Sequence, residues 1–310
     1  MKVYRGVEGL EGKFNSPALT LGNFDGVHRG HRKIFKQLRS KADEMGGEAV
    51  IFTFDPHPVK VLRPDEGPSL ISPLPEKLKL LEESAVDAVI LADFTRAFAE
   101  QHPAQFVREI IHERIKAGHV IVGHDFTFGK GKEGTIGSLK LLGEELGFHV
   151  EVIAAVKLDG QIVSSTRIRE LIRKGDVKEA AKLLGRCHYV TGEVIEGHGR
   201  GKPLGFPTAN LDYRAELIPE DGVYAAKAEI EGKMYGGATN VGTNPTFGDE
   251  KRSVETYIFD FNESLYGKTM KVSFVERIRG EIAFSSPHEL AGQIKRDISK
   301  VKTALNRADH

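Results

Sequence analysis

The stretch "LGNFDGVHRGH", residues 21–31, is a glycine-spaced turn between a short apolar run and a helical pattern. In an open sheet of parallel strands, ligands bind at the carboxyl ends of the strands, beside helix N-termini whose amides and dipole attract anions. The glycines allow a sharp turn and a close approach of the ligand. His28 and His31, three residues apart, fall on the same side of the following helix. The turn therefore predicts an anion site that two imidazoles face.

Two histidines at a helix start suit transfer at a phosphorus atom, which needs donors and positive charge where charge builds on the oxygens. Zinc binding is a weaker interpretation, because the His-Glu-x-x-His pattern is absent and no cysteine lies nearby. This motif alone is also compatible with a solvent-exposed helix start in which the histidines have no function.

The sequence around this turn alternates between short apolar runs and amphipathic stretches of helical period, from residue 17 to about 155. The helical stretches are expected over 30–45, 75–84, 103–117 and 137–146. Such alternation predicts a parallel sheet covered by helices on both faces, a doubly wound α/β domain. A last helix over about 166–184 opens with hydroxyl side chains that can cap it.

After about residue 186 the period changes to that of strands. The strand-like segments are "HYVTGEVI", "GVYAAKAEI", "KMYGGATNV", "VETYIFDF" and "KTMKVSFVERI", with one helix expected over about 287–304. This pattern predicts a small antiparallel β-barrel with a C-terminal helix against it. We therefore expect two domains, residues 1–185 and 186–310.

Composition limits the partners and the compartment. Forty-four basic and forty-four acidic residues leave no net charge, so neither nucleic acid nor a membrane surface is expected as a partner. Cys187 is the single cysteine and is interpreted as a bystander in a reducing compartment. Without a signal segment or a long apolar run, the chain is predicted to be cytoplasmic. The pattern leaves monomer or weak homo-oligomer open.

A second phosphate-binding pattern lies in "VSSTRIRELI", residues 163–172. Its hydroxyls, helix amides and guanidinium groups come from Ser164, Ser165, Thr166, Arg167 and Arg169. Alone, this segment is typical of a well-capped helix with a basic face. Together with the first motif it resembles the nucleotidylyltransferase superfamily, in which a His-x-x-His turn and a later Ser/Thr-rich helix start hold the ATP triphosphate from opposite sides.

In the second half, "GHGRGKPLGFPTANL", residues 197–211, predicts a basic glycine-rich loop around a polyphosphate. The loop residues are Gly199, Arg200, Gly201, Lys202, Gly205 and Pro207. Thr208 and Asn210 follow on one face of a strand, where a hydroxyl and an amide oxygen suit Mg²⁺ that already holds ATP phosphates. A hairpin loop with surface charges is the alternative.

The strand "VETYIFDF" sets Glu255, Tyr257 and Phe259 on one face. A carboxylate beside two aromatics is placed to accept a proton from a substrate hydroxyl, as a kinase base must. The same pattern is also compatible with a partly exposed edge strand.

Two tempting motifs do not support nucleotide sites of other classes. "GKGKEG", residues 129–134, satisfies G-x-G-x-x-G but does not follow the first strand, so a dinucleotide fingerprint is not expected. "LYGKT", residues 265–269, lacks the first P-loop glycine, because Asn262 occupies that position.

With these motifs assembled, the whole chain resembles the bacterial bifunctional riboflavin kinase/FMN adenylyltransferase family, also called FAD synthetase. The resemblance runs through "GNFDGVHRGH", "FDPHP", "VGHDFTFG", "SSTRIR", "GRGKPLGFPTAN", "ATNVGTNPTF", "SLYGK" and "RGEIAF". It implies a riboflavin-kinase barrel that makes FMN from riboflavin and ATP. It also implies a nucleotidylyltransferase-like N-terminal domain that makes FAD and pyrophosphate from FMN and ATP, both reactions with Mg²⁺.

The resemblance also implies residue roles. In the N-terminal half His28 and His31 would stabilise the adenylyl transition state, and the other ATP-binding residues would be Gly22, Asn23, Phe24, Asp25, Asp125, Ser164, Ser165, Thr166 and Arg167. In the barrel, Thr208 and Asn210 would hold metal and nucleotide, Glu255 would be the base, and Arg279 and Phe284 would lie near the flavin.

Two departures from the family pattern, Asn244 and Thr127, each stand where members often carry Arg. They put in doubt one contact near the kinase site and one basic contact in the adenylyl site. Loss of one of the two activities, or a barrel that binds single-stranded nucleic acid, remain the competing hypotheses.

Overall fold

The structure, a computed structural model, describes residues 1–197, 202–243 and 252–308. The chain divides into two compact units, Met1–Ser164 and Ser165–His310. Within the described ranges, no helix combines the length and the apolar run that crossing a lipid bilayer requires.

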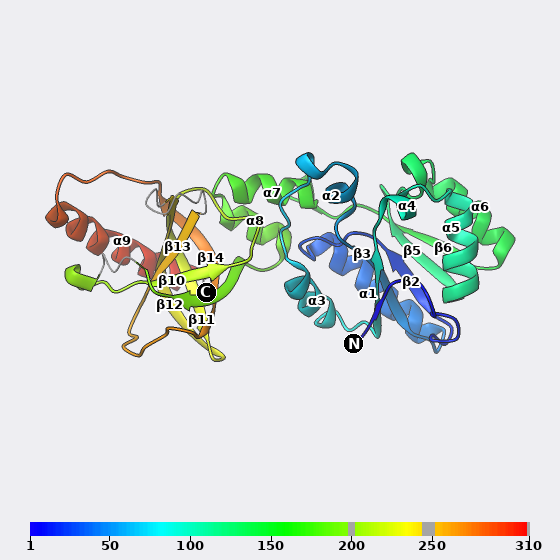
Figure 1. Cartoon of the computed structure of the whole chain (residues 1–310), viewed down its shortest axis with the longest axis horizontal. Helices are drawn as coiled ribbons and strands as arrows, with labels where there is room; N and C mark the ends of the chain where they lie inside the picture. Colours follow the sequence, from blue (N-terminus) through cyan, green and yellow to red (C-terminus); the bar gives the residue numbers. More distant parts are fainter. Residues whose placement is uncertain (198–201, 244–251, 309–310) are drawn as a thin grey trace. The chain divides into compact units, whose positions relative to one another are not determined.

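The first unit is built on a six-stranded sheet in the order β1-β4-β3-β2-β5-β6, and every neighbouring pair is parallel (Figure 1). Its strands are β1 (Lys2–Arg5), β2 (Ala18–Leu21), β3 (Ala49–Asp55), β4 (Ala88–Asp93), β5 (His119–Gly123) and β6 (His149–Ile153). The order reverses beside β2, so the turn after β2 opens at the switch point of a doubly wound sheet.

Helices cover both faces of this sheet. They are α1 (Arg29–Glu44), α2 (Pro58–Leu62), α3 (Leu74–Glu82), α4 (Arg96–Ala99), α5 (Pro103–Phe106), a wider π-helical continuation (Val107–Ile115) and α6 (Ile136–Leu146). Short 3-10 turns lie at Pro64–Glu66 and Lys130–Lys132, and a small hairpin joins β7 (Lys157–Leu158) to β8 (Gln161–Ile162). The four helices expected from periodicity are present, whereas β1, α2 and α4 carry too few residues to show a period.

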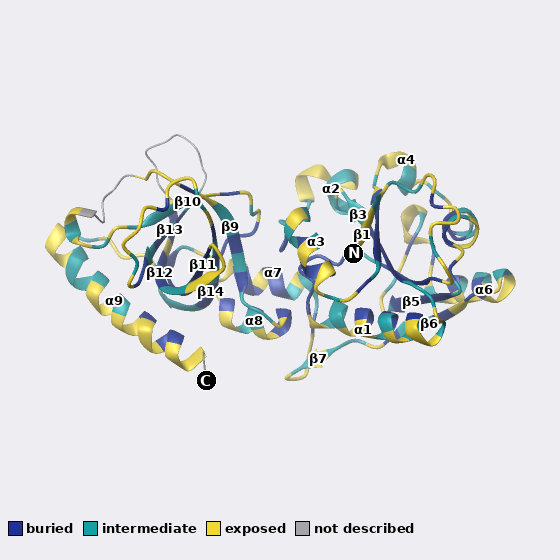
Figure 2. Ribbon diagram, turned by 90° about the horizontal axis from the view of Figure 1, so that it is seen from below, coloured by how far each residue is buried: buried dark blue, intermediate teal, exposed yellow. Residues whose placement is uncertain are grey.

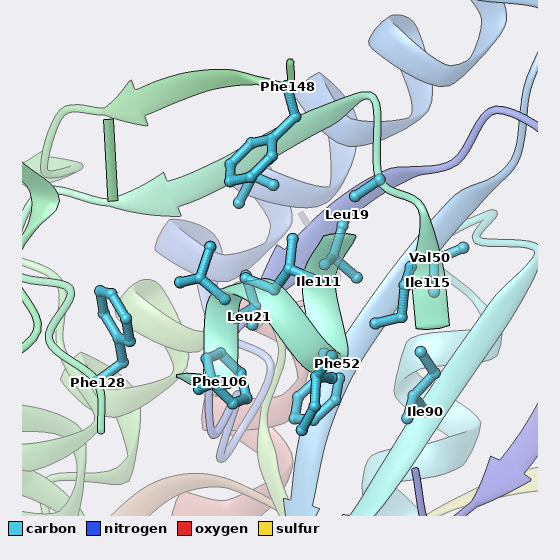
Figure 3. Close-up of a cluster of buried hydrophobic side chains, with 14 of the residues drawn as sticks. Leu19, Leu21, Val50, Phe52, Ile90, Phe106, Ile111, Ile115, Phe128 and Phe148 are labelled. Atoms are coloured by element: carbon cyan, nitrogen blue, oxygen red, sulfur yellow. The ribbon is translucent and has the colours of Figure 1, made fainter. Parts of the chain in front are cut away.

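Alternation along β2 explains why both faces are buried. Leu19 and Leu21 point into one core, where the π-helical segment contributes Ile111 (Figure 3). Ala18 points into the opposite core, which α1 fills with Phe35. Side chains alternate along a strand, so a fully apolar run of this kind requires cover on both sides.

The helix expected over about 166–184 is instead two helices, α7 (Ser165–Arg173) and α8 (Val177–Leu184). The chain breaks at Gly175, whose φ is 75°, and the Asp176 side chain then accepts from the amide of Glu179 to cap α8. Arg277 of the barrel donates to the carbonyl of Lys174 at 3.4 Å. Both helices belong to the second unit, and this hydrogen bond joins the connection between them to β14.

The second unit is a closed six-stranded antiparallel barrel in the order β10-β13-β12-β11-β14-β9 (Figure 2). Its strands are β9 (His188–Ile195), β10 (Ala209–Tyr213), β11 (Gly222–Ile230), β12 (Lys233–Thr243), β13 (Arg252–Ile258) and β14 (Thr269–Arg279), with a 3-10 turn at Lys202–Leu204. Tyr224, Phe274 and Val254 fill the interior. Closure removes the exposed edges that an open antiparallel sheet would present.

The C-terminal helix α9 (Pro287–Ala308) packs on the outside of the barrel. Val301 and Leu305 lie against the outward-facing side chains of Ala225 and Phe259. Cys187 is at the edge of this cluster, and burial raises the pKa of its thiol. A thiol held protonated is a weak nucleophile, which agrees with its interpretation as a bystander.

Candidate active sites

The turn after β2 is held in a strained conformation. Phe24 and Val27 have φ values of 50° and 39°, although neither is glycine, and both are almost fully buried. Gly26 has φ 79°, and a Cβ at this position would lie 2.9 Å from Cγ2 of Ile71. Strain of this kind persists only where the surroundings fix the backbone, and it clusters at ligand sites.

Asp25 supplies part of that fixation. Its carboxylate oxygens accept from the backbone amides of Ile71 and Ser72, both at 3.1 Å, and the residue is 3% exposed. Asp25 therefore fastens the turn to the segment before α3. The geometry gives this residue a role in shaping the turn.

His28 is the N-cap of α1. Its Nδ1 accepts from the backbone amide of His31 at 3.3 Å, and the two imidazole rings stack with centroids 3.5 Å apart. Because Nδ1 is the acceptor, the ring proton of a neutral His28 belongs on Nε2. The edge of Phe24 meets the ring of His31 at 5.2 Å. The two histidines expected to act together are thus neighbours at the positive end of a sixteen-residue helix.

Lys77, on α3, lies beneath the same turn and was not singled out from the sequence. Its Nζ lies 3.3–3.5 Å from the carbonyls of Phe54 and Asn23 and from Oγ1 of Thr53. Burial lowers the pKa of this ammonium, and the Asp25 and Asp55 carboxylates offset part of that effect. A lysine in an amphipathic helix gives no sequence signal of this kind, because its partners come from two strand ends far away in the chain.

Two other predicted residues of this half lie near the turn. Asp125 follows β5, the neighbour of β2, and is exposed; its Oδ1 lies 3.7 Å from Nδ1 of His124. Ser164 follows Val163, whose carbonyl is 3.7 Å from the place that a Cβ on Gly30 would occupy. The chain before Ser164 therefore runs alongside the start of α1.

The remaining members of the Ser/Thr-rich motif begin α7, in the second compact unit. They are Ser165, Thr166 and Arg167, and Arg167 forms an ion pair with Glu170 at 3.2 Å on the exposed face. Whether they reach the nucleotide stays a prediction.

A group of half-buried aromatic rings lies at the carboxyl ends of β3 and β4. Phe54 contacts Phe94 and Phe98 edge to face, with centroids 5.3 and 6.1 Å apart. Phe126, after β5, stacks on Phe128 at 5.5 Å. These rings offer apolar surface on the same sheet edge as His28.

In the barrel, Glu255 lies on the outer face of β13, and Oγ1 of Thr208 donates to its Oε2 at 3.4 Å. Its neighbours Tyr257 and Phe259 share that face, as the alternation predicts, with ring centroids 5.8 Å apart. β13 pairs with strands on both sides, so it is not an edge strand.

One cross-strand row joins four polar residues of the barrel through Val223. Asn210 of β10 pairs with Glu255, Glu255 with Asn240 of β12, Asn240 with Val223 of β11, and Val223 with Arg279 of β14. Asn240 was missed from the sequence, because only the register of β12 brings it opposite Glu255.

Part of the glycine-rich loop lies outside the described residues, namely Gly199, Arg200 and Gly201; so does Asn244. Lys202 begins a 3-10 turn, and Gly205 follows with φ 83°. After it, the Phe206 ring meets Tyr257 edge to face at 5.5 Å, which ties the chain before Pro207 to β13. Asn210 lies so close over Gly197 that a Cβ there would be 2.0 Å from its Nδ2.

Arg279 ends β14, with its guanidinium carbon 6.0 Å from the centroid of the Phe284 ring. The two residues expected near the flavin are therefore in contact. Among the described residues, no three His, Cys, Asp or Glu side chains are grouped to hold a metal ion.

Two family sequence profiles match the chain in order. The profile described as FAD synthetase matches residues 12–167, and that described as riboflavin kinase matches residues 184–305.

Full-length relatives agree with this order. The bifunctional riboflavin kinase/FMN adenylyltransferase of Haemophilus influenzae is 35% identical over 99% of this chain and 100% of its own length. The protein of the same name from Bacillus subtilis is 38% identical over 90% of this chain and 89% of its own. A crystal structure described as a macrolide-efflux protein from Streptococcus pneumoniae is 32% identical, covers 97% of this chain and 99% of its own, and superposes with a TM-score of 0.89.

Proposed function

The chain belongs to the bifunctional riboflavin kinase/FMN adenylyltransferase family, and from this premise we propose which residues carry each of its two reactions. The enzyme phosphorylates riboflavin with ATP to FMN, and it adenylylates FMN with a second ATP to FAD and pyrophosphate. We assign the second reaction to residues 1–185 and the first to residues 186–310.

The observation that carries the N-terminal assignment is the N-cap geometry of His28. In adenylyl transfer an FMN phosphate oxygen bonds to the α-phosphorus of ATP, and the bond from that phosphorus to the bridging oxygen breaks. Negative charge grows on the α-phosphate and on the departing pyrophosphate. The Nε2–H of His28, the ring of His31 and the first amides of α1 are suited to donate there.

The other N-terminal residues would bind the nucleotide or give the turn its shape. Gly22, Asn23 and Phe24 form the wall of the turn, with Asp25 and Lys77 as its supports. Asp125 would contact the nucleotide, and Ser164, Ser165, Thr166 and Arg167 would close on its triphosphate. The half-buried rings of Phe54, Phe94, Phe98 and Phe126 would pack against the flavin, since stacked aromatic surfaces attract one another.

In the barrel we assign the base to Glu255. Its carboxylate would accept the proton of the terminal ribityl hydroxyl while that oxygen bonds to the γ-phosphorus and ADP leaves. Thr208, which donates to Glu255, would hold the carboxylate beside the hydroxyl.

Magnesium fits this donor set. Thr208 and Asn210 offer a hydroxyl and an amide oxygen, and Mg²⁺ prefers such oxygen ligands with phosphates completing its shell. When bound, the ion would neutralise charge on the transferred phosphoryl group. The loop residues Gly199, Arg200, Gly201, Lys202, Gly205 and Pro207 would wrap the nucleotide, and Arg279 with Phe284 would contact the flavin ring.

Consumption of ATP for flavin synthesis suits the bacterial cytoplasm, and we assign the enzyme to that compartment. The bacterial relatives and the single, partly buried cysteine support this assignment.

Calorimetry tests the two-site assignment. Titration with a non-hydrolysable ATP analogue and Mg²⁺ should give two equivalents per chain. A Thr208→Ala/Asn210→Ala double variant should give one equivalent, keep FAD formation from supplied FMN and lose FMN formation. A single equivalent in the unaltered protein, or a double variant that still binds two, contradicts the proposal. Repetition with excess EDTA measures the metal requirement separately.

A further inference from the structure

A buried carboxylate joins the end of β14 to helix α9. Oδ2 of Asp297 lies 2.9 Å from Nε and 2.8 Å from Nη2 of Arg279, and the residue is 3% exposed. On the other side, Nε2 of Gln293 donates to Oδ1 at 2.8 Å. Both oxygens of Asp297 are therefore committed to directed bonds.

These bonds fix the orientation of the Arg279 side chain. Nη1 of the same guanidinium donates to the carbonyl of Gly280 at 2.8 Å, so each of its three nitrogens has an acceptor. A guanidinium is planar and carries five N–H donors, so three anchored nitrogens define its plane and still allow donation to a ligand. Phe284 lies over this group, 6.0 Å from its carbon.

The position of Arg279 in the cross-strand row separates it from the reacting end of the site. Three strand-to-strand steps lie between Glu255 and Arg279. At about 4.8 Å a step, the separation is about 14 Å along the barrel surface. That distance suits contact with the ring system of riboflavin while the ribityl hydroxyl reaches Glu255.

The charge of Arg279 is compensated by the carboxylate of Asp297. An unpaired guanidinium would favour an anion, whereas a paired one offers its flat face and remaining N–H groups to an uncharged ring. Riboflavin has no phosphate before the kinase acts, so a compensated arginine suits its ring.

We propose that Asp297, supported by Gln293, is a positioning residue of the riboflavin kinase. It holds Arg279 in the orientation that contacts the flavin ring and compensates its charge. This inference rests on the proposed flavin contact of Arg279.

A purely structural role would instead make Asp297 an anchor of α9. Leu305 provides the matched control, because it packs α9 onto the same barrel without touching Arg279; its Cδ1 lies 2.9 Å from the position of a Cβ on Gly236. Leu305→Ala should loosen α9 at least as much as Asp297→Asn does.

The experiment uses the full chain with Asp297→Asn, Gln293→Ala, Arg279→Ala and Leu305→Ala. It measures the Tm, the KM for riboflavin, the KM for ATP, kcat of FMN formation, and FAD formation from supplied FMN. Asp297→Asn should raise the riboflavin KM about tenfold, the effect of one weakened charged hydrogen bond, with ATP KM and FAD formation unchanged. Gln293→Ala should raise the riboflavin KM about twofold to threefold. Leu305→Ala should lower the Tm and leave the riboflavin KM unchanged.

Three results would overturn the inference. Equal changes of riboflavin KM in Asp297→Asn and Leu305→Ala would reduce Asp297 to an anchor. A raised riboflavin KM in Arg279→Ala, with none in Asp297→Asn and Gln293→Ala, would reject positioning and leave the Arg279 assignment standing. An unchanged riboflavin KM in Arg279→Ala would refute the flavin contact itself.

Discussion

The turn after β2 and the polar row of the barrel, the two proposed nucleotide sites, are built in different ways. The turn is contiguous: residues 22–31 supply its backbone, its strain and both histidines, and His28 is 5% exposed. The row takes one residue from each of five strands, and Glu255 and Asn210 remain half-buried on the outer face.

The difference follows the chemistry. Attack by an FMN phosphate needs no base, so a rigid cradle of donors is sufficient at the first centre. Attack by a ribityl hydroxyl needs a proton acceptor beside the alcohol, and neighbouring strands can set a carboxylate between a hydroxyl and an amide. A substitution at one centre should therefore leave the activity of the other unchanged.

The largest effect should come from Glu255→Gln. Loss of a general base lowers turnover by about a hundredfold to ten-thousandfold, so FMN formation should fall within that range while FAD formation from supplied FMN continues. Chromatography of both flavins measures the two rates in one sample. Glu229→Gln, which changes a surface carboxylate paired with Lys271, is the control. A normal rate of FMN formation in Glu255→Gln would show that another group is the base.

His28→Ala should lower FAD formation by about a hundredfold or more, the effect of losing one transition-state donor, with FMN formation unchanged. The control is His102→Ala, because His102 caps α5 through Nδ1 at the same 3.3 Å distance and has no proposed catalytic role. Similar losses in both variants would mean that only a helix cap had been measured. Parallel loss of FMN and FAD in His28→Ala would contradict separate centres.

The strain of the first centre should appear as a stability difference between two glycines. Gly26→Ala and Gly267→Ala both force a positive φ on alanine. At Gly26 the new methyl group also meets Ile71, whereas at Gly267, in the barrel unit, it enters open space. We expect the free energy of unfolding to fall by about 2–3 kcal/mol in Gly26→Ala and by about 1 kcal/mol in Gly267→Ala. Amide hydrogen exchange over β2–α1 and over β14 measures each unit separately. Equal costs would show that the turn gives way to the added methyl.

The smallest effect should be a pH dependence confined to the first unit. Burial, with a contribution from His149, lowers the pKa of His119 below its unfolded value, and the hydrogen bond to Glu151 offsets this only in part. As pH falls, His119 is therefore protonated in the unfolded chain before it is protonated in the folded one. The stability of this unit should fall as pH drops below about 6.5. His119→Gln should flatten that loss in urea unfolding followed by hydrogen exchange. His288→Gln, an exposed histidine on α9, should leave the slope unchanged, and an unchanged slope in His119→Gln would reject the assignment.

Sequence reasoning was sufficient where the determinants are local. Period and spacing were sufficient to predict the parallel sheet, five barrel strands and the adjacency of His28 and His31. The geometry of a helix or a strand fixes which of its residues are neighbours. The single helix expected over 166–184 was wrong, because Gly175 takes a left-handed conformation and the Asp176 side chain starts a new helix.

Long-range determinants were beyond that reasoning. Lys77 meets Asn23 and Thr53 only after α3 packs beneath the turn, and Asn240 meets Glu255 only through strand register. Asp297 was missed for the same reason, because its partner Arg279 belongs to another element of the barrel unit.

The pairing of β13 with two neighbours limits how this enzyme can diversify. Successive side chains of a strand point to opposite faces, so deleting or inserting one residue inside Arg252–Ile258 would turn Glu255 into the barrel lumen and bring Thr256 or Val254 to the outside. Insertions and deletions should therefore be tolerated in the loops that connect the strands and not inside β13. An engineered insertion should be placed in such a loop.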